Sequence, residues 1–133
     1  MAGTFNSLEE AREYFKKDRF ATDAGISIDV LDIGRCVCSM TIDDRHRNAN
    51  GGIMGGAIFT LGDLAFAVAS NHIHKPTVAQ QVSISFLRSA SAGKLTAEAI
   101  CLKDGRSSCV YNILIRDEKN KEIAQFVGTG FKL

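Results

Sequence analysis

One acidic residue stands out within a long apolar stretch of the sequence. Residues 53–71 are apolar on nearly every side of a predicted helix, and Asp63 is the only charged residue among them. A carboxylate in apolar surroundings loses hydration, so its pKa rises towards the range that a general base needs at neutral pH. The structural alternative is that Asp63 bridges backbone groups at a subunit contact. The residue alone leaves both roles open.

A glycine-rich entrance comes before Asp63 in the same helix. Gly55 and Gly56 follow a polar loop over 43–52. The first N–H groups of a helix have no partner inside it, and the positive end of the helix dipole lies there. Because glycine has no side chain, a substrate carbonyl can approach these groups closely. The pattern predicts an oxyanion hole for a tetrahedral intermediate.

The spacing of the two features constrains the site. Gly55 and Asp63 are eight positions apart, which is about 12 Å along a helix. One carbonyl therefore cannot contact the N–H of Gly55 and also a water molecule held by Asp63 of the same helix. Either one of the two residues is not catalytic, or the site is built from two subunits. We favour a two-fold dimer, in which antiparallel helices bring Gly55 of one chain opposite Asp63 of the other.

The remaining segments predict the elements that position this helix. Ser7 and Glu10 form a capping box, which predicts a short amphipathic helix over about 7–20. Alternation of apolar and polar residues predicts a β-hairpin over 25–42 that turns at 32–34. The same alternation predicts strands at 78–88, 94–103, 107–116 and 122–133.

Short connections between these strands predict an antiparallel sheet, and the apolar helix needs that sheet wrapped around it. We therefore predict an α+β hotdog fold, with a long central helix and a short N-terminal flanking helix. The whole of 1–133 forms one domain.

Composition excludes several classes of function. The formal net charge of +1 and the absence of a basic helix argue against nucleic acid and membrane surfaces as partners. The N-terminus lacks the apolar core of a secretory signal, which predicts a cytoplasmic protein. The four cysteines have no zinc-finger spacing and are expected to be reduced thiols. His72 and His74 lack a nearby third ligand, so no metal site is predicted.

The run N-x-x-G-x-x-x-G-G-x-x-x-x-L-x-D, from Asn48 to Asp63, resembles the signature of the PaaI-type (phenylacetate-pathway) hotdog thioesterases. The similarity covers nearly all of the chain past the first helix, including the pattern at 84–88 and the hairpin with Gly105. The resemblance implies an acyl-CoA hydrolase that is at least dimeric and commonly tetrameric, with no cofactor besides the coenzyme A of its substrate. It implies that Asp63 activates water or attacks the thioester, that the N–H of Gly55 polarises the carbonyl, and that Asn48 positions substrate or water.

The chain departs from that family at two places. The family usually has histidine where this chain has Met54, and a thioether cannot donate a hydrogen bond. We therefore expect an altered rate or substrate choice. A hydroxyl often found at the start of the third strand is also missing, and Gln80 or Gln81 would hold the water instead. The other substrate-binding candidates are Gly56 at the helix entrance, His46 at the pocket rim, and Arg88, Lys103 and Arg106 for coenzyme A phosphates.

Two other functions compete with hydrolysis. A hydratase or dehydratase on the same fold would use a histidine with an acidic partner, and 53–71 contain no histidine. A non-catalytic acyl-CoA-binding protein would keep the apolar pocket and the glycine entrance but would not need a base. The presence of Asp63 favours the hydrolase. Its acyl group is expected to be small or medium, aromatic groups included.

Overall fold

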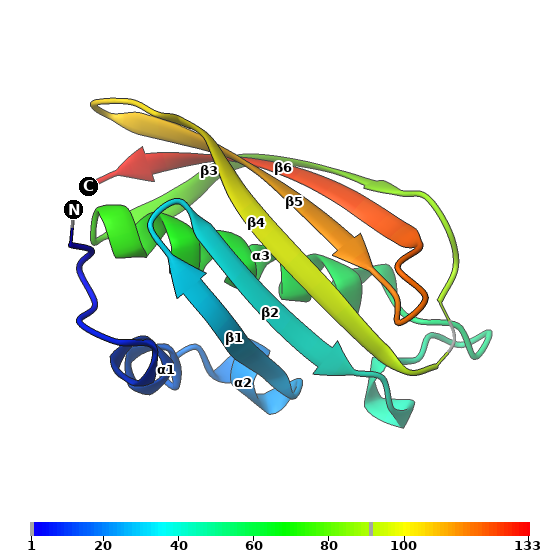
Figure 1. Ribbon diagram of the computed structural model, residues 1–133. Helices are drawn as coiled ribbons and strands as arrows, with labels where there is room; N and C mark the ends of the chain where they lie inside the picture. Colours follow the sequence, from blue (N-terminus) through cyan, green and yellow to red (C-terminus); the bar gives the residue numbers. More distant parts are fainter. Residues whose placement is uncertain (1, 91) are drawn as a thin grey trace.

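A six-stranded antiparallel sheet wraps around one long helix, α3 (Gly55–Ile73), in the computed structural model (Figure 1), which describes residues 2–90 and 92–133. The strands lie in the order β1-β2-β4-β5-β6-β3, so β1 and β3 form the two edges of the sheet. The predicted hotdog fold is therefore confirmed. The strand bounds are β1 (Ile26–Asp32), β2 (Arg35–Thr41), β3 (Thr77–Phe86), β4 (Lys94–Asp104), β5 (Ser108–Arg116) and β6 (Glu122–Lys132).

The N-terminal flank differs from the single helix expected over about 7–20. It forms two short helices, α1 (Leu8–Phe15) and α2 (Arg19–Asp23). Half of the predicted capping box is present, since the Ser7 hydroxyl accepts a hydrogen bond from the N–H of Glu10 at 3.1 Å. The Glu10 carboxylate instead accepts from the side-chain amide of Asn6 at 3.1 Å. Phe15 and Ala21 are both buried, yet six helical positions would place them about 120° apart around one helix. Breaking the helix between them lets both side chains face the core.

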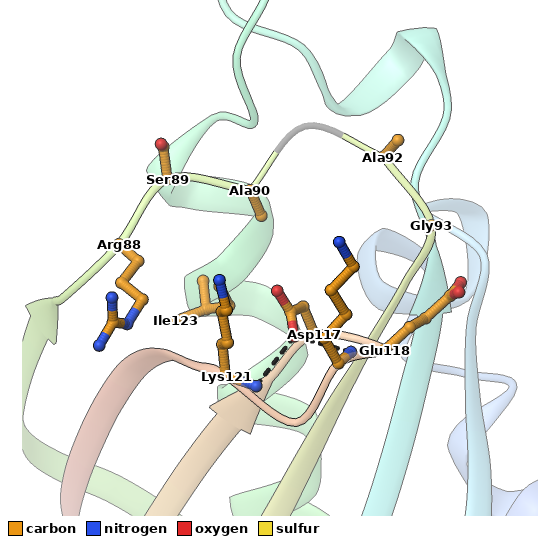
Figure 2. A pocket seen from close by; sticks show the side chains of 10 residues that line it. Arg88, Ser89, Ala90, Ala92, Gly93, Asp117, Glu118, Lys121 and Ile123 are labelled. Atoms are coloured by element: carbon orange, nitrogen blue, oxygen red, sulfur yellow. Dashed lines mark hydrogen bonds between the residues drawn. The ribbon is translucent and has the colours of Figure 1, made fainter.

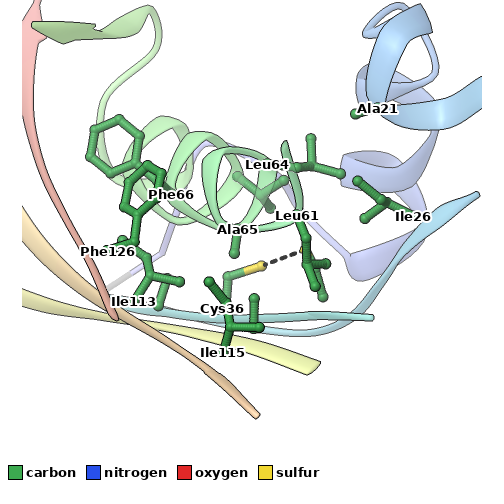
Figure 3. Close-up of a cluster of buried hydrophobic side chains, with 14 of the residues drawn as sticks. Ala21, Ile26, Cys36, Leu61, Leu64, Ala65, Phe66, Ile113, Ile115 and Phe126 are labelled. Carbon is green, nitrogen blue, oxygen red and sulfur yellow. Dashed lines mark hydrogen bonds between the residues drawn. The ribbon is translucent and has the colours of Figure 1, made fainter. Parts of the chain in front are cut away.

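The buried side of α3 packs closely on the sheet. Figure 3 shows Leu61, Ala65 and Phe66 of the helix facing a floor that includes Ile113 and Phe126, and all five are almost fully buried. A Cβ atom added at Gly62 would stand 3.0 Å from the ring of Phe126, and one at Gly128 would stand 3.1 Å from Phe66. Glycines at the contact therefore set the short distance between helix and sheet. The cysteines are free thiols, as predicted.

Side-chain hydrogen bonds fix the far end of α3. The amide of Asn71 donates to the carbonyl of Thr77 at 3.0 Å, and its oxygen accepts from the N–H of Thr77 at 3.0 Å. This pair of bonds places the start of β3 against the C-terminal end of α3. β3 then runs back beside the helix, so that the ring of Phe86 lies 3.1 Å from where a Cβ of Gly55 would stand. Within the described ranges, none of the helices has the length and hydropathy needed to span a bilayer.

Candidate active site

Asp63 lies on the side of α3 that faces away from the sheet. Gly56, Thr60, Asp63 and Ala67 follow one another at helical spacing and form a stripe that is at least partly exposed, whereas Leu61 and Ala65 on the opposite side are inaccessible to solvent. Partial burial raises the pKa of Asp63, and the nearby charge of Asp18 raises it further. Asp63 forms no hydrogen bond or ion pair with the part of the chain that the structure describes. Its carboxylate is thus available as a base or nucleophile.

The entrance of α3 offers free hydrogen-bond donors. Met54 is the N-cap, and its carbonyl accepts from the N–H groups of Ala57 at 3.0 Å and Ile58 at 3.3 Å. The N–H groups of Gly55 and Gly56 donate to none of the described residues. Two neighbouring donors at the positive end of a helix of 19 residues can stabilise a carbonyl oxygen that gains negative charge.

Asn48 organises the loop that leads into this entrance. Its side-chain oxygen accepts from the N–H groups of Asn50 at 2.9 Å and Gly52 at 3.1 Å. Its side-chain NH₂ group has no partner among the described residues. The group can therefore donate a hydrogen bond to a ligand. Asn48 and Gly55 line the same hollow, of about 480 Å³, together with Phe86 and Arg88. The structure therefore brings two of the three predicted catalytic residues together.

A second, more apolar hollow of about 540 Å³ lies along the exposed side of the helix entrance. Met54, Gly56 and Phe59 line it, and Phe20 of α2 stands over it with 81% of its surface exposed. His46 also forms part of the wall, but both of its ring nitrogens are engaged. Nδ1 accepts from the N–H of Asp43 at 3.0 Å, so Nε2 carries the proton and donates to the carbonyl of Ala24 at 2.6 Å. His46 shapes the pocket and offers no free nitrogen to a ligand.

Comparison with known proteins identifies the family. The profile of the Thioesterase superfamily matches residues 50–124. The chain is 34% identical to acyl-coenzyme A thioesterase PaaI of Escherichia coli (strain K12) over 126 residues, which are 94% of this chain and 90% of that protein. This chain belongs to the thioesterase superfamily.

Solved structures of similar proteins agree with this assignment. The E. coli PaaI protein from the phenylacetic acid degradation operon superposes with a TM-score of 0.87 at 33% identity, over 96% of both chains. A Streptococcus mutans UA159 protein, solved bound to acetyl CoA, superposes with a TM-score of 0.77 at 27% identity, over 80% of this chain and 87% of its own. The predicted resemblance to PaaI-type hotdog thioesterases is confirmed, and the chain is a thioester hydrolase.

The phosphate-binding candidates of this thioesterase separate to opposite ends of the sheet. Arg88 lies beside Asn48 at the N-terminal end of α3. Lys103 and Arg106 flank the β4–β5 turn, where Gly105 accepts a hydrogen bond from Lys132 Nζ at 2.7 Å. The N–H of the next residue, Leu133, donates to Pro76, just past the C-terminal end of α3. The structure therefore does not bring Lys103 and Arg106 to the N-terminal end of α3 that holds Gly55.

The two glutamines lie on the exposed edge strand. Gln80 is the extra residue of a β-bulge in β3, since the register with β6 shifts between Ala79 and Gln81. Both side chains are exposed and lie about midway along α3, between the contacts of β3 with Asn71 and with Gly55. A role in holding water stays a prediction.

The paired histidines have other partners. His72 Nδ1 accepts a hydrogen bond from the N–H of Phe5 at 3.4 Å, and the two rings stack with centroids 5.8 Å apart. Burial lowers the pKa of His72. His74 Nε2 lies 3.0 Å from the carbonyl oxygen of Leu133. Across the described residues, no cluster of three or more His, Cys, Asp or Glu side chains has a geometry that could hold a metal ion.

Four residues near the site were not among the sequence candidates. Phe20 stands over the apolar hollow, Asp18 raises the pKa of Asp63, and Lys119 and Lys121 line a further hollow with Arg88. The only local signal for the lysines was a polar turn between two strands. Their position beside Arg88 depends on the order of the strands in the sheet.

Proposed function

We propose that this thioesterase hydrolyses acyl-coenzyme A at a site shared by two chains, with Asp63 from one chain and the N–H of Gly55 from the other. The observation that carries this proposal concerns two groups of one helix. A partly buried carboxylate and the first helix N–H groups both lack partners among the described residues, and they lie too far apart to serve a single carbonyl. The name of the E. coli relative and the acetyl CoA in the S. mutans structure support coenzyme A thioesters as the substrate class.

The chemistry needs three groups. Asp63 removes a proton from a water molecule while the water oxygen attacks the thioester carbon, and the carbonyl oxygen takes up the negative charge. The N–H of Gly55, with that of Gly56 beside it, stabilises this oxyanion. Collapse of the intermediate breaks the C–S bond, and the departing thiolate takes the proton from Asp63. If Asp63 attacks directly, the acyl group passes first to its carboxylate and water then hydrolyses the anhydride; the N–H groups serve both courses. The side-chain NH₂ group of Asn48 would orient the thioester or the water by donating a hydrogen bond to its oxygen.

The surface around Asp63 supports a dimer. The stripe of Gly56, Thr60, Asp63 and Ala67 is at least partly exposed in one chain, and β3 beside it is an edge strand. Exposed apolar side chains along that edge include Val78 and Phe86. An edge strand with apolar residues is a template for pairing with a second strand. Antiparallel pairing of two β3 strands would place the two α3 helices side by side with opposite directions.

Two finer assignments belong to the same proposal. We place the acyl group in the apolar hollow of Phe20, Met54 and Phe59, whose size of about 540 Å³ suits small, medium and aromatic acyl groups. Pairs of dimers would form a homotetramer in the cytoplasm. Light scattering of the purified protein measures the assembly directly.

The first experiment follows thiol release from acetyl-, octanoyl- and phenylacetyl-CoA by the purified protein. Release from at least one of them is expected. Tight binding of all three without any release would contradict hydrolysis of acyl-CoA and favour a binding role.

The second experiment removes one hydrogen-bond donor without breaking the helix. Gly55 is the first helical residue, where proline fits because its missing N–H has no partner in the helix. Met54 has ψ 133°, which suits a residue before proline. Gly55→Pro deletes the donor, whereas Gly55→Ala adds a similar Cβ and keeps it. We expect Gly55→Pro to lower kcat by a further factor of about 10²–10³ relative to Gly55→Ala. Equal activities would remove Gly55 from the mechanism.

A mixing experiment tests whether the site is shared. Asp63→Asn and Gly55→Pro chains should each be inactive alone. After subunit exchange at equal amounts, about half of the dimers contain one chain of each kind, and each of these has one intact site. About a quarter of wild-type activity should return. No recovery in a mixture shown by mass spectrometry to have exchanged would contradict a shared site.

A further inference from the structure

A basic hollow adjoins the hollow that holds Gly55 and Asn48. Its volume is about 560 Å³, and Lys119 and Lys121 of the β5–β6 turn line it together with Arg88. Figure 2 shows Arg88 and Lys121 in this hollow. Arg88, Ser89 and Ala90 belong to the walls of both hollows. A ligand can therefore extend from the oxyanion donors of α3 into the basic hollow along this shared segment.

The three cations of this hollow are not neutralised by ion pairs. No side-chain hydrogen bond, ion pair or aromatic contact of Arg88, Lys119 or Lys121 exists within the described residues. Many cations elsewhere in the chain have such partners, for example Arg35 with Glu98 at 2.8 Å.

The two acids of the hollow are held by backbone groups. Asp117 Oδ1 accepts from the N–H groups of Lys119 and Lys121, both at 2.9 Å. Glu118 Oε1 accepts from the N–H of Lys94 at 2.7 Å. Both acids therefore have backbone partners, and the lining of the hollow keeps three cationic side chains against two carboxylates.

The backbone on both sides of the hollow is fixed before any ligand arrives. The N–H groups of Leu87 and Arg88 donate to the carbonyl of Ile123 at 2.8 and 3.3 Å, which ties the loop after β3 to the start of β6. Across the hollow, Asp117 closes the β5–β6 turn, and its N–H donates to the carbonyl of Lys121 at 3.0 Å. Pre-ordered backbone reduces the entropy lost when the flexible side chains engage a charged ligand.

Building on the proposed function, we infer that Arg88, Lys119 and Lys121 bind the phosphate groups of the substrate's coenzyme A. In an acyl-CoA the pantetheine arm separates the thioester from the diphosphate and the ribose phosphate. A thioester at Gly55 with its arm along Arg88, Ser89 and Ala90 brings those phosphates to the basic hollow. Arginine and lysine suit phosphate oxygens because each bond is charge-assisted. This assignment makes Lys119 and Lys121 specificity residues for coenzyme A thioesters.

The test compares two substrates with the same acyl group. Acyl-pantetheine keeps the thioester and the arm of acyl-CoA but lacks the phosphates that Lys119 and Lys121 would bind. For the double variant Lys119→Ala/Lys121→Ala we expect KM for acyl-CoA to rise about 10- to 100-fold, since two charge-assisted hydrogen bonds to phosphate are lost at a site where solvent screens them. Its kcat, and its KM for acyl-pantetheine, should match the wild type. Calorimetry with free coenzyme A should show the same loss of affinity without any turnover.

Two further variants separate local from general charge effects. Lys16→Ala/Lys17→Ala removes the same charge from the exposed turn that follows α1 and should leave both KM values unchanged. Lys103→Ala/Arg106→Ala removes two cations at the opposite end of the sheet that form no ion pair with the residues the structure describes. A larger rise in KM for acyl-CoA from that pair than from the Lys119/Lys121 pair would overturn the inference.

The outcome also distinguishes the two proposals. If the wild type hydrolyses acyl-CoA and acyl-pantetheine with equal KM, the phosphate site is wrong while the hydrolase function stands. If the double variant raises KM for both substrates equally, the lysines act on something other than phosphate, and the inference is again wrong. If neither substrate releases thiol with the wild type, the proposed function fails first.

Discussion

Asp63→Asn is the most informative single substitution, because it should change activity and stability in opposite directions. Asparagine is nearly the same size as aspartate, but it cannot act as a base and carries no charge at any pH. The carboxylate has no bonds within the described chain, so the exchange breaks no observed interaction. Any large effect must come from the charge and basicity of Asp63.

The expected loss of activity follows from the role of the carboxylate. A positioned general base contributes a factor of about 10²–10⁴ to the rate, which corresponds to about 3–5 kcal/mol of transition-state stabilisation. The pKa of Asp63 is raised by burial and by Asp18. Because the base works only when deprotonated, wild-type kcat should fall with decreasing pH at a higher pH than for an ordinary aspartate. The pH profile of kcat for the variant should lack this decrease at acidic pH, the acidic limb.

The expected gain in stability follows from the same pKa. A carboxyl group whose pKa is higher in the folded protein binds more protons when folded, so stability falls as pH rises from its ordinary pKa, 3.8, through the raised value. At neutral pH the charged Asp63 therefore destabilises the fold, and the neutral asparagine removes that effect. We expect a higher Tm for Asp63→Asn at pH 7 and a smaller difference as the pH is lowered.

The assay combines thiol release with thermal unfolding at one protein concentration, since subunit association also shifts Tm. Asp29→Asn, which removes a charge from β1, serves as the matched control and should change neither quantity appreciably. Retention of more than about a tenth of wild-type kcat would contradict the catalytic role. A lower Tm at pH 7 would show that Asp63 has a stabilising partner and would refute the electrostatic argument.

Three further predictions follow from single contacts. Asp18→Asn removes the second cause of the raised pKa of Asp63, so the acidic limb of the kcat profile should move to lower pH. Gly62→Ala would push a Cβ to 3.0 Å from Phe126, and we expect a loss of about 1–3 kcal/mol in the free energy of unfolding, measured with urea. Met54→His places a hydrogen-bond donor at the exposed N-cap of α3, where Met54 makes no cap bond, and should raise kcat in the thiol-release assay; an unchanged kcat would show that the side chain does not reach the thioester.

The elements of the fold could be predicted because the spacing of apolar residues along the sequence indicates which side of each element is buried. Leu95, Ala97 and Ala99 alternate along β4 and are all inaccessible to solvent, while the residues between them are more exposed. The helix of 53–71 was predicted from continuous apolarity and was found two residues later, at Gly55–Ile73. The prediction of one helix in the N-terminal flank was wrong. A capping box marks where a helix begins, whereas the break after Phe15 depends on how two segments pack on the core.

The site could be predicted only where its parts lie close in the sequence. Asn48, Gly55 and Asp63 belong to one loop and one helix, so their relation follows from helix geometry. Lys121 and Arg88 come together because β3 and β6 are neighbours in the sheet, and no local pattern encodes which strands are neighbours. The hydrogen bonds of His46 could not be predicted for the same reason, since its Nε2 bonds to the carbonyl of Ala24, which is distant in the sequence.

The strand order has a consequence for synthesis of the chain on the ribosome. β3 leaves the ribosome directly after α3, yet its hydrogen-bonding partner in the sheet is β6, the last strand to be made. Until β6 emerges, β3 has both backbone edges open while its apolar residues Val78 and Phe86 face water. A nascent chain in this state can pair with another copy through β3. Slow translation between β3 and β6 should therefore promote aggregation, and a chain cut before β6 should be recovered mainly as insoluble protein.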